Sequence, residues 1–70
     1  MHGYGLVVDD PSRVVYETAD GSERLTFDRN RRRVRKEAVD DAGRMRPSPV
    51  QPRDFGLIMD VMRSIGWRFD

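Results

Sequence analysis

Cysteine is absent from the 70-residue chain, and histidine and lysine occur once each. Without cysteine, neither a disulfide framework nor a thiolate zinc site can stabilise the fold. The single histidine, His2, has no cysteine partner and lies beside the N-terminus, where it is poorly placed to act as an oriented catalytic base. A domain of this length buries only about 60% of the surface of its unfolded chain. We therefore expect one small domain (1–70) of thin stability, without enzymatic activity, metal, cofactor or small-molecule substrate.

Long apolar runs are also absent. No stretch approaches the roughly 18 apolar residues that a membrane span requires. Residues 1–10 lack the basic segment and the apolar stretch of a secretory signal. We therefore expect a cytoplasmic protein with no membrane partner. Charged residues make up 36% of the chain, yet the apolar residues are clustered and periodic, which argues against a disordered chain.

The first part of the sequence has the two-residue periodicity of β-strands. Residues 3–8 alternate apolar and small side chains, and residues 13–18 and 23–28 are rich in β-branched and aromatic residues. Asp20-Gly21 supplies the positive φ angles that a hairpin turn requires, so residues 13–28 are predicted to form a hairpin. The side chains expected to point inward are Tyr4, Leu6, Val8, Val14, Tyr16, Leu25 and Phe27.

The segment 30–42 fits two structures. A strand over 32–39 would turn Val34 inward. A helix capped by Asp28 and ended by Gly43 would also place its few apolar residues on one face. The helical stripe is narrow and weakly apolar, so the pattern favours the strand.

The last third of the chain begins with a proline-rich connector, 44–53, which holds three prolines and cannot form a regular helix or a central strand. An amphipathic helix over 52–65 is then predicted, with Gly66 as its stop. Its apolar residues recur at intervals of three and four positions, at Phe55, Ile58, Met62, Ile65 and Phe69.

These elements predict an α+β fold in which a small antiparallel β-meander (1–43) of three or four strands packs against one C-terminal helix and tail (54–70). A further expectation is that the meander closes into an SH3-like or barrel-like structure. Ile58, Met62, Ile65 and Trp67 are expected to complete the core.

Apolar residues cover most of the predicted helix, which is broader than the stripe usual for a monomer. Two explanations remain open. The helix could form a homodimer interface, or a curved sheet could wrap around it. The residues predicted for the interface are Phe55, Leu57, Met59, Val61 and Met62.

Two pairs of neighbouring carboxylates, Asp9-Asp10 and Asp40-Asp41, are the only candidates for a cation site. Both lie beside turn residues, where aspartate commonly hydrogen-bonds its own backbone. We therefore assign them to turns.

The charges of the chain are segregated. Residues 1–28 hold six acids and two arginines (−4), residues 29–36 hold six cations (+6), and residues 37–70 hold six acids and five arginines (−1). Arginine accounts for all but one of the cations, and its planar guanidinium suits bidentate pairing with phosphate or carboxylate. The strong positive patch is therefore local.

This basic run is the predicted functional site. As a strand, it would direct Arg31, Arg33 and Arg35 to one side, about 6 to 7 Å apart, so that a polyanion could make several phosphate contacts. Three interpretations compete: binding to nucleic acid, binding to an acidic protein surface, and protection of a sheet edge. The aromatic residues are predicted to point inward, so contact with phosphates is favoured over base stacking. The residues assigned to polyanion binding are Arg29, Arg31, Arg32, Arg33, Arg35 and Lys36.

In outline, the segments GYGLVV, RVVYET, DGSE and RLTFD resemble the opening of small β-barrel modules of the cold-shock or Tudor and KOW kind. Such modules bind nucleic acid, RNA polymerase or other proteins. The likeness covers about half of the chain. The aromatic RNA-binding motifs of cold-shock domains are missing and the C-terminal helix is foreign to the minimal barrel, so no residue role is carried over. We expect a non-enzymatic regulatory or accessory module that binds nucleic acid, or alternatively a protein-interaction adaptor.

Overall fold

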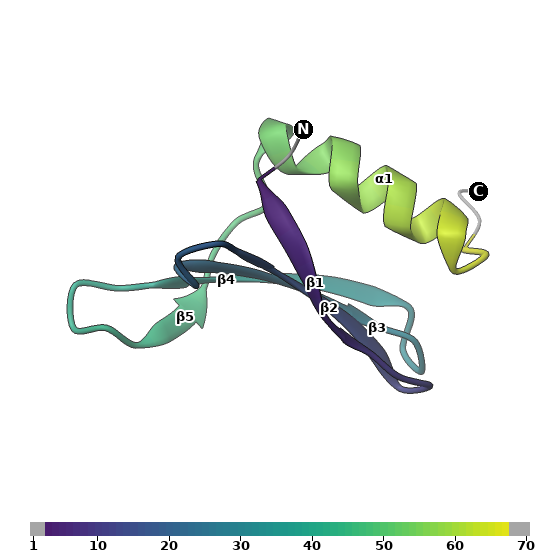
Figure 1. The fold of residues 1–70 in the computed structure, drawn as a ribbon, viewed down its shortest axis with the longest axis horizontal. Helices are drawn as coiled ribbons and strands as arrows, with labels where there is room; N and C mark the ends of the chain where they lie inside the picture. Colours follow the sequence, from purple (N-terminus) through teal and green to yellow (C-terminus); the bar gives the residue numbers. More distant parts are fainter. Residues whose placement is uncertain (1–2, 68–70) are drawn as a thin grey trace.

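The computed structural model describes residues 3–67 and consists of one antiparallel sheet with a helix across one face (Figure 1). His2 and Phe69 lie outside the described residues. A short 3-10 turn, Pro52–Asp54, leads directly into the helix α1, Phe55–Ser64. The strands, in sheet order, are β1 (Tyr4–Asp9), β2 (Arg13–Thr18), β3 (Glu23–Asp28), β4 (Arg33–Val39) and β5 (Met45–Pro47).

The sheet is open, because β1 and β5 form its two edges and each pairs with one neighbour. The α+β class and the packing of a meander against a C-terminal helix are confirmed; closure into a barrel is not. The meander has five strands and not three or four, because Met45–Pro47 of the predicted connector pairs with residues 37–39 of β4. Pro47 is tolerated there because an edge strand needs hydrogen bonds on one side only.

The predicted hairpin of β2 and β3 is present, with Glu17 opposite Arg24 and a turn built around Asp20. Asp20 Oδ1 accepts hydrogen bonds from the Ser22 hydroxyl (2.7 Å) and from the Ser22 N–H (3.0 Å), while Gly21 has a φ of 74°. These bonds, led by that of the Ser22 hydroxyl, lower the pKa of Asp20 to about 2.

Segment 30–42 forms a strand and not a helix, since β4 spans Arg33–Val39. In the preceding turn, Asp28 Oδ1 accepts hydrogen bonds from the N–H groups of Asn30 (3.0 Å) and Arg31 (3.1 Å). Arg32 has a φ of 55°, a left-handed conformation that reverses the chain tightly. Asp28 therefore stabilises this turn and does not cap the start of a helix.

A β-bulge interrupts β1. Leu6 lies opposite Tyr16, whereas Val8 lies opposite Val15, so Val7 is the extra residue. Strict alternation predicted that Leu6 and Val8 both enter the core, and this is wrong. The bulge moves Val8 to the sheet face that carries Val15. Leu6 is not covered by the core, since 53% of the residue is exposed to solvent.

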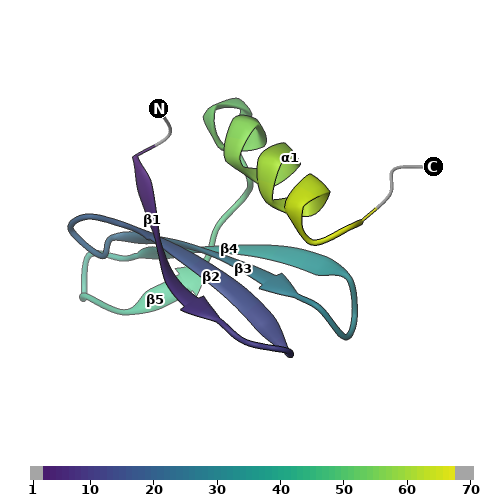
Figure 2. The same cartoon turned by 45° about the vertical axis from the view of Figure 1, so that its right-hand side comes forward.

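The core lies between α1 and one face of the sheet, and the opposite face has no helix over it (Figure 2). Phe27 is fully buried and makes edge-on contacts with Tyr16 (ring centroids 6.2 Å apart) and Trp67 (6.4 Å). The buried cluster comprises Val14, Leu25, Phe27, Leu57 and Val61. Partly buried residues around it are Tyr4, Tyr16, Val34, Ile58, Met62, Ile65 and Trp67.

Candidate functional site

Four of the six residues in the predicted basic site form a continuous exposed surface. Arg31 and Arg32 lie in the turn between β3 and β4, and Arg33 and Arg35 lie on β4. This turn is at the end of the sheet away from β5 (Figure 1). Strand alternation turns Arg33 and Arg35 away from α1, because Val34 and Lys36 between them face the core.

The guanidinium groups of these four arginines are free of ion pairs and hydrogen bonds within residues 3–67. Asp28 is an opposing charge that lies beside Arg31, Arg33 and Arg35. The N–H of Arg31 is the main cause that lowers the pKa of Asp28, and the charges of Arg31 and Arg35 act in the same direction. The four cations are thus available to an external anion.

Arg13 belongs to the same surface, although it is distant in the sequence. In the sheet register, Arg13 lies opposite Asp28, which in turn lies opposite Arg33. Arg13 is exposed, and within the described residues it makes no ion pair. The prediction from the basic run missed Arg13, but the hairpin register around Asp20-Gly21 could have placed it there. We call Arg13, Arg31, Arg32, Arg33 and Arg35 the arginine surface.

A hollow of about 390 Å³ opens within the arginine surface. Asp28 and Val34 form part of its lining, and the remaining lining comes from three guanidinium-bearing residues. These are Arg31, Arg33 and Arg35. Since β5 pairs only with residues 37–39 of β4, no strand of the described region covers β4 beside this hollow.

Two residues assigned to polyanion binding lie elsewhere. Arg29 turns back toward β1, where its Nη2 atom lies 3.1 Å from Asp9 Oδ1 and its backbone N–H bonds to Ser12. Lys36 is only 4% exposed and cannot reach an external ligand. The assignment of Lys36 to the exposed cationic site is therefore wrong, because strand alternation directs it toward the core beside Leu25.

Lys36 is instead the centre of a buried polar cluster. Its Nζ atom donates to Asp54 Oδ2 at 2.7 Å and lies 3.0 Å from Glu23 Oε1. Asp54 is fully buried and also accepts hydrogen bonds from the Tyr4 hydroxyl (3.0 Å) and the Gln51 N–H (2.9 Å). The cluster joins β1, β3 and β4 to the start of α1. Glu23 is also paired with an exposed arginine, Arg53.

Hydrogen bonds keep this cluster charged despite its burial. Burial alone would raise the pKa of Asp54, but bonds from Lys36, Gln51 and Tyr4 outweigh it and lower the pKa. Burial would lower the pKa of Lys36, but its bonds to Asp54 and Glu23 raise it. Burial and the bond to Asp54 both raise the pKa of Tyr4. The cluster is thus a fixed ion pair and not a proton donor poised near neutral pH.

The uncovered sheet face provides no platform for stacking bases. Val15 and Thr26 are buried beneath long charged side chains, and Arg24 pairs with Glu17 at 2.9 Å. The aromatic residues Tyr16 and Phe27 pack on the α1 side. The arginine surface can therefore offer charge and hydrogen bonds to phosphates.

The residues predicted for the helix interface are divided between two environments. Leu57 and Val61 are buried against the sheet and belong to the core, which corrects their assignment to an interface. They lie one turn apart, so a single face of α1 carries both. Phe55 and Met59 are 53% and 37% exposed, and Met62 is partly buried. The helix thus presents a narrower apolar strip to solvent than its sequence predicts.

Within residues 3–67, no group of three histidine or acidic side chains comes together in a way that could hold a metal ion. The helix of the described region is too short and too polar to cross a membrane. No protein-family model, curated protein or solved structure matches the chain.

Proposed function

We propose that this chain is a non-enzymatic binding module that uses the arginine surface to bind the phosphates of nucleic acid in the cytoplasm. The observation that supports the proposal most strongly is the absence, within the described residues, of any ion pair to Arg31, Arg32, Arg33 and Arg35. The fold neutralises Arg24, Arg29 and Lys36 with its own carboxylates but leaves these four exposed.

The chemistry of the surface suits phosphate recognition. Guanidinium groups bind phosphate oxygens in a planar, two-pronged geometry, and each contact releases counterions from the nucleic acid. Arg33 and Arg35 are two residues apart on one strand, about 6 to 7 Å, so they can contact successive phosphates. Turn residues Arg31 and Arg32 extend the surface beyond the end of the sheet. Binding of this kind depends on charge and shape more than on base sequence.

Titration with generic duplex and single-stranded DNA or RNA at low and moderate salt tests the proposal. We expect binding that weakens steeply with salt, and we expect the double variant Arg33→Ser/Arg35→Ser to lose most of it. The matched control is Arg44→Ser/Arg63→Ser, which removes the same charge from exposed arginines outside the arginine surface. Absence of binding at low salt, or equal loss in both double variants, would refute the proposal.

An acidic protein surface is the second candidate partner. It is favoured by the hollow between Arg31, Arg33 and Arg35, where an uncovered stretch of β4 adjoins three guanidinium groups. An acidic extended segment could pair with this backbone and place carboxylates against the arginines. Pull-down of the intact chain from its own cell extract, with and without nuclease, separates the two. Capture that survives nuclease favours the protein partner, and capture that nuclease abolishes favours nucleic acid.

A further inference from the structure

The two edges of the sheet differ in how well they are protected from pairing. β5 is a three-residue strand that contains Arg46 and Pro47, both of which discourage the addition of another strand. β1 is twice as long, and residues 3–8 carry no charge and no proline. Among the strands of the described region, β1 pairs with β2 alone. In a chain with 36% charged residues, β1 is therefore an unusually open edge.

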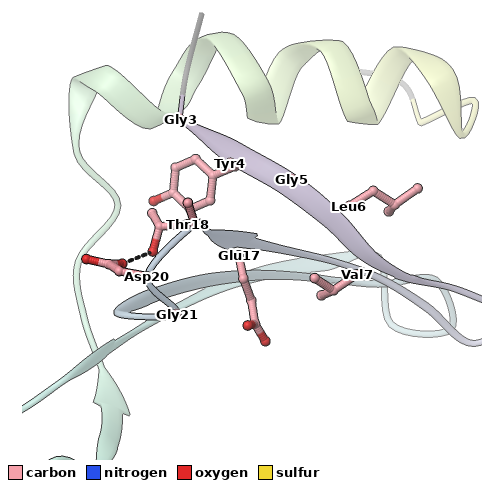
Figure 3. A pocket seen from close by; sticks show the side chains of 10 residues that line it. Gly3, Tyr4, Gly5, Leu6, Val7, Glu17, Thr18, Asp20 and Gly21 are labelled. Atoms are coloured by element: carbon pink, nitrogen blue, oxygen red, sulfur yellow. Dashed lines mark hydrogen bonds between the residues drawn. The ribbon is translucent and has the colours of Figure 1, made fainter.

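The backbone conformation at position 5 does not require glycine. Gly5 does not have a positive φ, and a Cβ atom added there would meet nothing within 4 Å. In a strand, such a glycine often marks a bulge, as between Leu6 and Val8 here, or a place where a ligand or another backbone approaches closely. A shallow groove of about 670 Å³ lies over Gly5, bounded by Val7 and by residues 17–21 (Figure 3). The fold thus leaves a hollow that none of its own side chains fills.

The neighbours of Gly5 are two exposed apolar side chains. Leu6 and Val7 are 53% and 52% exposed. Figure 3 shows Val7 on the same side of the sheet as Glu17, whereas Leu6 leaves β1 in another direction. Gly5 lies opposite Glu17 in the register, so the hollow over Gly5 and the Val7 side chain are on one face, two residues apart.

We propose that β1 is the interface of a homodimer, in which β1 of a second copy pairs with it antiparallel about a twofold axis at Leu6. This register places Leu6 opposite Leu6 of the second copy, and it places Val7 of each chain opposite Gly5 of the other. Each Val7 then fills a hollow over glycine, and this happens twice because the interface is isologous. One sheet runs through both copies.

A second copy fits this edge better than an unrelated peptide. Gly5 and Val7 lie on one face two residues apart, so an antiparallel pairing about a twofold axis at Leu6 brings each Val7 opposite Gly5 of the other copy. Because residues 3–8 are uncharged, the pairing brings no like charges face to face. The two Asp9 residues, one from each copy, lie at opposite ends of the interface. The bulge at Val7 shortens the ladder, so the dimer dissociates on dilution. Arg33 and Arg35 of the arginine surface lie on β4, which β2 and β3 separate from β1, so the dimer does not depend on nucleic-acid binding.

Sedimentation from micromolar to millimolar concentration tests the interface on the complete chain. We expect a monomer–dimer equilibrium that Leu6→Lys weakens by about tenfold or more, because edge lysines oppose strand pairing. The matched controls, Val39→Lys and Val50→Lys, add the same charge at other exposed apolar residues, 42% and 36% exposed, and leave the equilibrium unchanged. A chain that stays monomeric at millimolar concentration would overturn the proposal.

Gly5→Val gives a second test that does not depend on added charge. The monomer has room for the new side chain at Gly5, so the variant folds normally, as far-ultraviolet circular dichroism will show. It fills the hollow and is expected to weaken the dimer. Met59→Asp serves as the comparison for a dimer through α1. If Met59→Asp dissociates the dimer while Gly5→Val and Leu6→Lys do not, the interface is the helix and the β1 proposal is wrong.

The absence of native cysteine allows the proposed β1 interface to be mapped by introducing single cysteines. Leu6→Cys is expected to form an intermolecular disulfide under mild oxidation, because Leu6 lies at the twofold axis. Val39→Cys, at an exposed position on β4, is expected to stay reduced under the same conditions. Equal cross-linking of the two variants would indicate random collision and would contradict the proposed register.

Discussion

Lys36 Nζ lies 2.7 Å from Asp54 Oδ2 and joins the fourth strand to the residue that precedes the helix, 18 positions later. The basic run that supplies the exposed arginines therefore also supplies the cation that attaches the helix to the sheet. Lys36 is the only lysine of the chain, and its flexible stem carries a compact ammonium into the core. Because successive residues of a strand face opposite sides of the sheet, this segment supplies side chains both to the surface and to the interior.

Asp54→Asn is expected to destabilise the fold by about 3 kcal/mol or more, because it leaves the buried Lys36 ammonium without its closest counter-charge. Urea denaturation followed by circular dichroism measures the loss. The double variant Lys36→Met/Asp54→Leu removes both charges and is expected to recover most of the stability. If Asp54→Asn and the double variant were equally unstable, packing and not the ion pair would be responsible.

Tyr4→Phe is expected to cost about 1 kcal/mol, since it deletes one hydrogen bond to Asp54 and keeps the ring. The comparison is Tyr16→Phe. The Tyr16 hydroxyl makes no hydrogen bond within residues 3–67, so its removal should change little. Thermal unfolding of the two variants measures the difference. Equal melting temperatures would show that the bond to Asp54 contributes nothing to stability.

Stability is expected to be greatest between about pH 4 and pH 10, bounded by the unfolded pKa values of aspartate, tyrosine and lysine. The folded pKa of Asp54 is lowered, so its contribution is full above the unfolded pKa and is lost as the pH falls through the folded pKa. The pKa of Asp20 is lowered to about 2, so its contribution to stability is also lost as the pH falls.

At alkaline pH the signs reverse. The folded pKa values of Lys36 and Tyr4 are raised, so their contributions are full below the unfolded values and decline as the pH rises through the folded values. Urea midpoints measured across the pH range check both limbs. The Lys36→Met/Asp54→Leu variant should show a flatter profile, and an unchanged profile would contradict the role of the cluster.

Leu57→Ala is expected to cost about 2 to 5 kcal/mol, because Leu57 is 2% exposed and its removal leaves a cavity against the sheet. Met59→Ala, two residues further along α1, is expected to cost under about 1 kcal/mol because Met59 is largely outside the core. Chemical denaturation of both variants tests which face of α1 is buried. Similar losses at the two positions would contradict the packing described above.

Local signals predicted much of the fold. The Asp20-Gly21 turn fixed one hairpin, and two-residue periodicity placed Val14, Leu25 and Phe27 in the core. The apolar repeat around Ile58 and Met62 predicted the helix. These features depend on residues close together in the chain, so a single sequence is enough to reveal them.

Features that depend on residues far apart in the sequence were missed. The bulge that exposes Leu6 depends on the pairing of β1 with β2, and the glycines at positions 3 and 5 permit a bulge without fixing its position. Burial of Lys36 depends on Asp54 and Glu23, which only the folded chain brings together. Leu57 and Val61 were assigned to an interface because a helix with a broad apolar surface does not reveal which side meets the sheet.

The salt dependence of duplex DNA binding tests the central claim most directly. Plots of log K against log salt are expected to have a slope of about −4, from four or five phosphate contacts, and each arginine removed should reduce its magnitude by about 1. Arg33→Ser/Arg35→Ser should therefore give about half of the parental slope, and Arg44→Ser/Arg63→Ser should keep it. Binding that is insensitive to salt, or a slope that both double variants change equally, would contradict the account.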